Sequence, residues 1–276
     1  MNLNIVVCIK PVPDPEHYDK ITINPITKTI TRQGIPTIIN PDDKHALEAA
    51  IQLKEKHGGK VTVITMAPPN ADETLREALA MGADEAYLLT DRAFAGADTL
   101  ATSYTISQGI KEMGDFDIVL TGAESADGAT SQVPAQLAEW LEIPHLWNVR
   151  EFSLEDGKEI KVKTKIENGY MEYAIKYPAL LAVARDINKP RYIKIINIMK
   201  AKNKPLTVLT KEDLDLDESY LGLKGSPTQP GGIFTPSMQR AGEELKGSTE
   251  EIVEQLIEKL KASGILSALN VNRKGE

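Results

Sequence analysis

Short apolar, β-branched runs alternate with longer segments of helical periodicity through the first half of the chain. The runs at 3–10, 60–68, 85–90 and 117–122 predict buried strands, and the segments between them predict helices. Strands that alternate with helices are typical of βαβ units, which build a parallel sheet covered by helices on both faces. We therefore expect an α/β fold with a doubly wound, mostly parallel, Rossmann-like sheet.

Capping residues mark the predicted helix starts. Asn40 before Pro41 predicts an N-cap followed by proline at the first helical position. Asn70 and Glu73 have the spacing of a capping box, and Asp98 precedes a third helix. Each helix is thus bounded by a local signal as well as by its periodicity.

The second half of the chain has a different pattern. Residues 149–184 alternate polar and apolar positions around the turn dipeptides Asp156-Gly157 and Asn168-Gly169, which predicts added β-hairpins that extend the same sheet. We expect one α/β domain over residues 1–204. Residues 205–276 are rich in proline and glycine and then form one amphipathic helix, so we expect an extended C-terminal arm that packs on another protein.

Composition narrows the class of protein. The chain has 276 residues, 41% hydrophobic and 26% charged, as in an ordinary soluble globular protein. Its net charge of -8 argues against nucleic acid as a partner. No apolar run approaches the roughly 20 residues of a membrane span, and the first residues do not resemble a signal peptide, so we expect a cytoplasmic protein. The single cysteine, Cys8, forms no internal disulfide and reads as a buried packing residue.

Four segments follow the predicted strands or begin the first helix, and they should meet at one edge of the sheet. They are residues 8–11, 40–43, 66–69 and 122–133. Ligands of doubly wound sheets bind at this edge, beyond the carboxyl ends of the strands.

The last of these segments carries the most chemistry. Thr130, Ser131 and Gln132 place hydroxyl and amide groups at a predicted helix N-terminus, where backbone N–H groups favour anions. Ordinary helix capping would use the same residue types without any ligand.

Three further residues of this loop have predicted roles. We expect Gly122 to let the backbone approach a ligand closely and Gly128 to adopt a positive φ in a turn. Asp127 suits a ribose hydroxyl or an adenine amino group, because a carboxylate repels phosphate and accepts hydrogen bonds.

Familiar catalytic and metal motifs are missing from the sequence. It contains neither a GxGxxG nor a Walker GxxxxGKS motif, and no GxSxG elbow. The four histidines are scattered, without the paired spacing of metal sites. We therefore expect no catalytic residue and no metal ligand in this chain.

Four blocks of the chain, in their order, resemble the beta subunit of electron-transfer flavoproteins. The blocks are VVCIKPVPD, INPDDKHALEAAIQLKEK, TLREALAMGADEAYLL and NKPRYIKIINIMKAK. The resemblance covers residues 1–204 and implies an adenine-nucleotide-binding sheet. It also implies a complex with a larger alpha subunit, whose mobile domain carries an FAD and on which the arm of residues 205–276 would pack.

The resemblance places eleven residues on nucleotide-contacting segments of the family. They are Cys8, Asn40, Asp43, Met66, Gly122, Asp127, Gly128, Thr130, Ser131, Gln132 and Val133. In ordinary members the nucleotide is AMP, which fills a structural role, and in the electron-bifurcating branch it is a second FAD.

Two features resemble the bifurcating branch. The loop SADGATSQV matches that branch's DGxTxQV pattern, and the long tail resembles its extended arm. Pro134 stands where that branch usually has glycine, so the backbone near the phosphates is expected to differ. In this interpretation NADH reduces an FAD held here, and the electrons go separately to ferredoxin and to an acyl-CoA dehydrogenase-like partner. A plain carrier with structural AMP is the alternative, and a regulatory adenine-nucleotide-binding module is a third.

Residues 189–204 form a basic patch that the resemblance interprets as a partner-recognition loop. In the family this loop docks an acyl-CoA dehydrogenase. Ile195 takes the place of the apolar anchor, and Arg191, Lys194 and Lys200 flank it. From the residues alone, a basic solvated loop that closes the domain would explain the same pattern.

Overall fold

A computed structural model describes residues 2–20, 22–23, 30–31, 35–229, 231 and 242–265 of the chain. The chain divides into two compact units, Met1–Ile233 and Phe234–Glu276.

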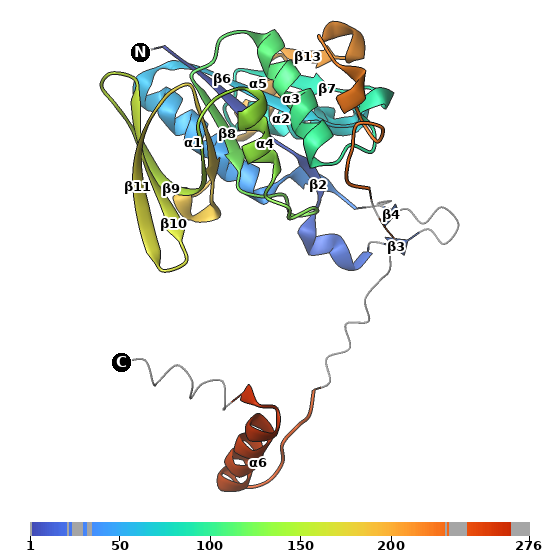
Figure 1. The fold of residues 1–276 in the computed structure, drawn as a ribbon, viewed down its shortest axis with the longest axis vertical. Helices are drawn as coiled ribbons and strands as arrows, with labels where there is room; N and C mark the ends of the chain where they lie inside the picture. The colour runs from blue at the N-terminus through green and yellow to red at the C-terminus, as the bar shows by residue number, and fades with distance from the viewer. Residues whose placement is uncertain are drawn as a thin grey trace. The chain divides into compact units, whose positions relative to one another are not determined.

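The strands and helices follow one another in the order shown in Figure 1. The strands are β1 (Leu3–Cys8), β2 (Pro11–Pro13), β3 (Thr22–Ile23), β4 (Ile30–Thr31), β5 (Thr37–Ile39), β6 (Gly59–Met66), β7 (Glu85–Leu89), β8 (Ile118–Gly122), β9 (His145–Glu155), β10 (Glu159–Ile166), β11 (Gly169–Lys176), β12 (Ala179–Val183) and β13 (Leu206–Leu209). The α-helices are α1 (Pro41–His57), α2 (Asp72–Met81), α3 (Thr99–Met113), α4 (Val133–Trp140), α5 (Ile195–Ala201) and α6 (Thr249–Ala262).

A nine-stranded sheet with the order β11-β10-β9-β12-β8-β1-β6-β7-β13 organises the first unit. The strands from β9 to β13 in that order pair in parallel, and β10 and β11 add antiparallel hairpins at one edge. The doubly wound, mostly parallel sheet is confirmed, and so are the hairpins at both predicted turns.

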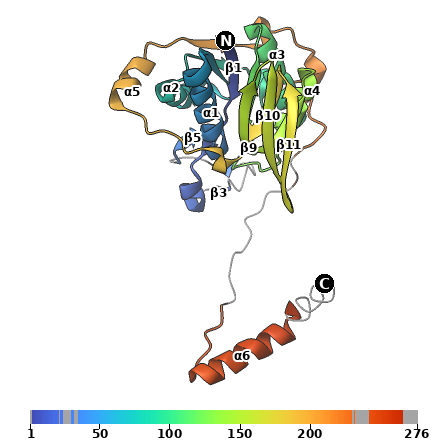
Figure 2. The same cartoon turned by 90° about the vertical axis from the view of Figure 1, so that its left-hand side faces the viewer.

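Helices cover both faces of this sheet (Figure 2). The helices α1 and α2 pack on one face, over a core of fully buried side chains such as Ile5, Leu47 and Leu75. The helices α3 and α4 pack on the other face, over residues such as Val119 and Leu137. Because both faces are covered, the central strands are mostly apolar on both sides.

The predicted helix starts have mixed outcomes. Asn40 is the N-cap residue of α1, as expected, but its side chain makes no capping hydrogen bond. Asp98 caps α3 by accepting from the backbone N–H groups of Leu100 and Ala101, as predicted. The capping box of Asn70 with Glu73 was wrong, because a 3-10 turn at Pro69–Ala71 leads directly into α2.

The compact unit extends beyond residue 204, where the sequence had placed the end of the α/β domain. The strand β13 pairs with β7 and adds one more parallel strand to the sheet. The second unit contains α6, which begins with a capping box between Ser248 and Glu251. Among the residues that the structure describes, no helix combines the length and apolarity needed to span a membrane.

Candidate functional site

A cleft of about 820 Å³ opens at the carboxyl ends of β1, β6, β7 and β8. The strand β1 lies between β6 and β8, and the connections that leave it and β8 run to opposite faces of the sheet. Such a switch point leaves a crevice that helix packing does not fill. The volume lies within the roughly 300–1,000 Å³ that is usual for ligand sites.

Ten of the eleven predicted nucleotide-contacting residues line this one cleft. They are Cys8, Asn40, Asp43, Met66, Gly122, Gly128, Thr130, Ser131, Gln132 and Val133. Asp127 lies beside the cleft, where its carboxylate pairs with the Lys10 ammonium at 2.6 Å. The topology thus brings together segments that are more than one hundred residues apart in the chain.

A buried carboxylate joins three walls of the cleft. Asp43 Oδ2 accepts from the Lys10 backbone N–H at 2.7 Å, and Oδ1 accepts from the Gly122 N–H at 3.1 Å and from Asn40 Nδ2 at 3.0 Å. Burial raises the pKa of Asp43 to about 7, although these three donors act in the opposite direction. No cation is among these partners, so the site holds Asp43 by oriented N–H groups.

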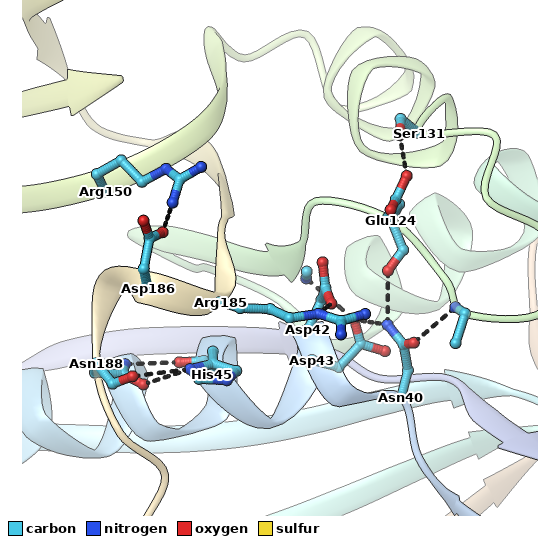
Figure 3. A network of polar contacts seen from close by, with 12 residues as sticks. Asn40, Asp42, Asp43, His45, Glu124, Ser131, Arg150, Arg185, Asp186 and Asn188 are labelled. Atoms are coloured by element: carbon cyan, nitrogen blue, oxygen red, sulfur yellow. Dashed lines mark hydrogen bonds and ion pairs between the residues drawn. The ribbon is translucent and has the colours of Figure 1, made fainter. Parts of the chain in front are cut away.

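The Asn40 side chain, 1% exposed, fixes the loop after β8 (Figure 3). Its Nδ2 donates to the Glu124 carbonyl at 2.8 Å, and its Oδ1 accepts from the Ala126 N–H at 2.9 Å. The Glu124 carboxylate in turn accepts from the Ser131 hydroxyl at 3.1 Å. The polar atoms of Asn40 therefore shape the loop from inside the protein.

The structure gives Gly122 a role within the chain, and the prediction for Gly128 was wrong. A Cβ on Gly122 would lie 2.4 Å from Asp43 Oδ1, so the start of α1 approaches the backbone closely there. The positive φ predicted for Gly128 occurs instead at Ala129 (47°) and Ser131 (55°). Non-glycine residues rarely adopt this conformation, and such positions cluster at ligand sites.

The loop geometry creates an anion cradle at the start of α4. Ser131 has a left-handed conformation and Gln132 a right-handed one, with φ -91° and ψ -34°. Consecutive residues of opposite hand form a concave nest of N–H groups. Thr99, the first residue of α3, donates its hydroxyl to Gln132 Oε1 at 2.9 Å, which joins the N-termini of α3 and α4 at the cleft.

Pro134 fits this cradle in a specific way. It occupies the first turn of α4, where its missing N–H removes a donor that has no partner within the helix. The cradle therefore offers one backbone donor fewer than it would with glycine at this position. With its nest, the nearby Lys10 ammonium and its volume, the cleft has the donors and the space that the phosphates and sugar of a nucleotide require.

Sequence reasoning missed one whole wall of the cleft. Residues 89–99, from the end of β7 to the start of α3, line this wall. Lys10, Glu124 and Ser125 also line the cleft and lie within segments that were expected there, and Thr121 directly precedes one of those segments. The sequence did contain a signal for this wall. Residues 85–90 were predicted as a parallel strand, and the carboxyl ends of parallel strands lie at the same edge of the sheet. The residues of this segment carry no motif that would have singled them out.

Cys8 lies at the floor of the cleft and is buried, as predicted. Burial raises the pKa of its thiol well above the usual range, and the nearby Asp43 carboxylate adds to this effect. The thiol therefore stays protonated and packs as a small apolar group.

The predicted docking residues surround α5, away from the cleft. Ile195, the first residue of α5, is 79% exposed, and Ile196, Ile198 and Met199 are also exposed. Lys194 and Lys200 are exposed beside them. We call these four apolar side chains the α5 patch.

Arg191 differs from its neighbours because its charge is engaged within the chain. Its guanidinium forms two hydrogen bonds with Glu48, at 2.8 and 3.0 Å, and two with Glu55, at 2.6 and 3.0 Å. This geometry raises the pKa of Arg191 and lowers that of Glu55. Arg191 therefore anchors the segment before α5 to α1.

Two further pairs fasten the same segment to α1 (Figure 3). Arg185 pairs with Asp42, and Asn188 both accepts from and donates to His45. With the pair of Arg191 and Glu48, these contacts occur at every third residue both in residues 185–191 and along α1. We call residues 185–191 the strap.

The fold and the cleft define an α/β protein of Rossmann-like architecture with a ligand site at the switch point of its sheet. A family model described as the electron transfer flavoprotein domain matches residues 27–214. The chain therefore belongs to the electron transfer flavoprotein family, as a beta subunit and electron carrier.

Three curated relatives illustrate this membership. The electron transfer flavoprotein subunit beta of Thermoanaerobacterium thermosaccharolyticum is 49% identical over 96% of this chain and 100% of its own length. The caffeyl-CoA reductase-Etf complex subunit CarD of Acetobacterium woodii is 44% identical, with the same coverage. The acryloyl-CoA reductase electron transfer subunit gamma of Anaerotignum propionicum is 40% identical over 94% of this chain and 98% of its own length.

Proposed function

We propose that this chain binds FAD in its cleft and acts, with an alpha subunit, in an electron-bifurcating complex. The observation that carries the proposal is the extent of the cleft. It continues from the cradle at Gly128–Val133 to Met66–Pro69 and on to the 89–99 segment. AMP is only the adenylate half of FAD and would leave much of this space unused.

The names of relatives support the same proposal. Two of them are subunits of complexes named for a caffeyl-CoA reductase and an acryloyl-CoA reductase. By analogy, the partner of this chain would be an acyl-CoA dehydrogenase-like enzyme, reached through the FAD of the alpha subunit. NADH would be the electron donor and ferredoxin the second acceptor.

The chemistry that FAD would supply in this cleft is acceptance of two electrons from NADH and their release one at a time to two acceptors. The residues of the chain would bind and orient it. The nest at Ser131 and Gln132, with Lys10, would hold phosphate groups, and Asp127 would accept from a ribose hydroxyl. The buried Asp43 would keep the loops after β1 and β8 at a fixed separation.

The α5 patch would dock the dehydrogenase-type partner. A small apolar anchor beside exposed cations allows fast encounter and fast release, which suits a transient redox partner. Ile195 would be the anchor, with Lys194 and Lys200 guiding the encounter. Arg191 would hold the patch in place from behind.

The direct test is a count of bound cofactors. The chain would be copurified with its alpha subunit, the complex denatured, and the released FAD and AMP quantified by absorbance and chromatography. Two FAD and no AMP per heterodimer are expected. One FAD with one AMP would refute FAD binding by this chain and support the alternative, a plain carrier with structural AMP.

A further inference from the structure

Two buried threonines of the sheet have hydroxyl groups without a hydrogen-bond partner among the described residues. They are Thr65 on β6, which is 1% exposed, and Thr121 on β8, which is 5% exposed. A buried hydroxyl that makes no hydrogen bond loses its interaction with water and destabilises the fold. Each such group in a folded protein therefore calls for a specific explanation.

Other buried hydroxyls of the same domain do have partners. Within α3, Ser103, Thr105 and Ser107 donate to backbone carbonyls three or four residues earlier, at 2.7 to 2.9 Å. That arrangement needs a helix, because a strand carries the corresponding carbonyls far away along its axis. A strand threonine has to find a partner across the sheet, as Thr62 does on Glu85 at 3.0 Å.

Position separates Thr121 from Thr65. Thr121 lines the cleft, whereas Thr65 is absent from the described residues that line it. Val6 pairs with Val119 and Val7 with Leu120, and the next residues of these two parallel strands, Cys8 and Thr121, both line the cleft. The alternation of the strand turns Thr121 toward the face covered by α3 and α4.

The other groups at this part of the floor do not use the Thr121 hydroxyl. Cys8 is buried beside it, and Ile106 of α3 is apolar. The Asp43 carboxylate at the start of α1 already accepts from Lys10, from Asn40 and from Gly122, the residue that follows Thr121 in β8. The hydroxyl is thus a neutral donor and acceptor in an otherwise apolar part of the site.

We infer that the Thr121 hydroxyl forms a hydrogen bond with the nucleotide bound in this cleft. The inference rests on the function proposed above and adds a residue to its binding site. A neutral hydroxyl can donate to a ring nitrogen or accept from an amino or ribose hydroxyl group, so it suits the nucleoside part of an adenine nucleotide. The charged groups Lys10 and Asp127 lie at the cradle instead.

Matched substitutions at the two threonines test this role. Thr121→Val and Thr65→Val both replace an unpaired hydroxyl with a methyl group of similar size on the same sheet. The full-length variants would be purified with the alpha subunit, stripped of nucleotide by dialysis, and titrated with AMP and with FAD by calorimetry. The Tm of each stripped complex would be measured alongside.

Thr121→Val should weaken the tighter-binding nucleotide about five- to tenfold, because it leaves a ligand polar group unpaired. Thr65→Val should leave the affinity within about twofold, and neither change should lower the Tm of the stripped complex. Thr121→Ser should recover most of the affinity. If Thr121→Val does not fold, Thr121→Ala removes the same hydroxyl and carries the same expectation.

Unchanged affinity in Thr121→Val, or an equal loss in both valine variants, would overturn the inference and leave nucleotide binding itself intact. Wild-type complex that binds neither AMP nor FAD would instead refute the proposed function, and this inference with it. The two failures are therefore distinguishable in one set of titrations.

Discussion

The cleft and the α5 patch are both supported by α1, but the cleft depends on buried polar groups and the patch consists of exposed apolar ones. At its N-terminus, α1 contributes Asn40 and Asp43, whose buried polar atoms fix two loops around a ligand site. Along its side, α1 holds the strap, and the exposed apolar side chains of the α5 patch follow the strap in the chain. The ligand site is organised before binding, whereas the patch keeps its apolar surface available for a partner.

This difference has energetic consequences. Removing a hydrogen-bonded polar group of the cleft, such as the Asp43 carboxylate, leaves buried donors without partners and should affect both stability and binding. Removing an apolar group from the α5 patch changes little inside the protein, because those side chains are already in water. Substitutions in the two regions should therefore separate stability from docking.

The largest effect is expected for Asp43→Ala. The change leaves the N–H groups of Lys10 and Gly122 buried without their acceptor and should lower the free energy of unfolding by about 2 to 4 kcal/mol. Urea denaturation of the purified complex measures this loss, and the nucleotide retained after gel filtration should fall with it. Glu112→Gln, an exposed change on α3, is the control. Wild-type stability in Asp43→Ala would contradict the role of Asp43 as the link between the loops.

The pH dependence of stability gives a second test of the buried carboxylate. The pKa of Asp43 is raised to about 7 in the folded chain, so the folded state binds its proton more tightly than the unfolded state does. Stability from this group is complete below the unfolded pKa of about 4 and is lost as the pH rises toward 7.

The comparison with Asp43→Asn isolates this group, because asparagine cannot ionise. Between about pH 5 and pH 7, the wild type should lose roughly 2 kcal/mol relative to the variant. Urea unfolding at several pH values measures the difference. A constant difference across this range would show that Asp43 is ionised throughout.

A change at Ile195, the anchor proposed for the α5 patch, should affect docking alone. Ile195→Ala should slow electron transfer to a dehydrogenase-type partner about fivefold or more at limiting partner concentration, because an interface anchor is lost. Tm should stay within about one degree, since Ile195 is 79% exposed. Ile166→Ala, an exposed apolar change on β10, should leave electron transfer unchanged. Equal rates in both variants would remove Ile195 from the docking site.

The fold could be predicted from the sequence because its signals are local. Apolar runs and the dipeptides at residues 156–157 and 168–169 set strands and turns within a few residues of themselves. The cleft segments followed from one topological rule about strand ends. The same rule applies to residues 89–99, which begin at the end of the predicted strand at 85–90. They were not predicted as part of the site because they contain no recognisable motif.

Other features could not be read from the sequence because they depend on distant contacts. Arg191 meets Glu48 across 143 residues, so its charge looked free for docking. Asn40 looked like a helix cap, yet its side chain binds a loop more than eighty residues away. The left-handed conformations of Ala129 and Ser131 had no signal in the sequence either, since neither residue type favours them.

The smallest effect is expected for the two carboxylates of α1 that bind Arg191. Glu55→Gln removes one partner of Arg191 at an exposed position and should cost about 0.5 kcal/mol of stability, while Glu48→Gln, at a 4% exposed side chain, should cost more. If Arg191 positions the α5 patch, both changes should slow electron transfer to the dehydrogenase-type partner, about twofold for Glu55→Gln. If the guanidinium instead meets the partner directly, releasing it from Glu55 should leave the rate unchanged or raise it. The same rate measurement with Glu112→Gln controls for the loss of one negative charge. A slower rate in Glu55→Gln then indicates that Arg191 positions the α5 patch, and an unchanged or faster rate indicates that Arg191 contacts the partner.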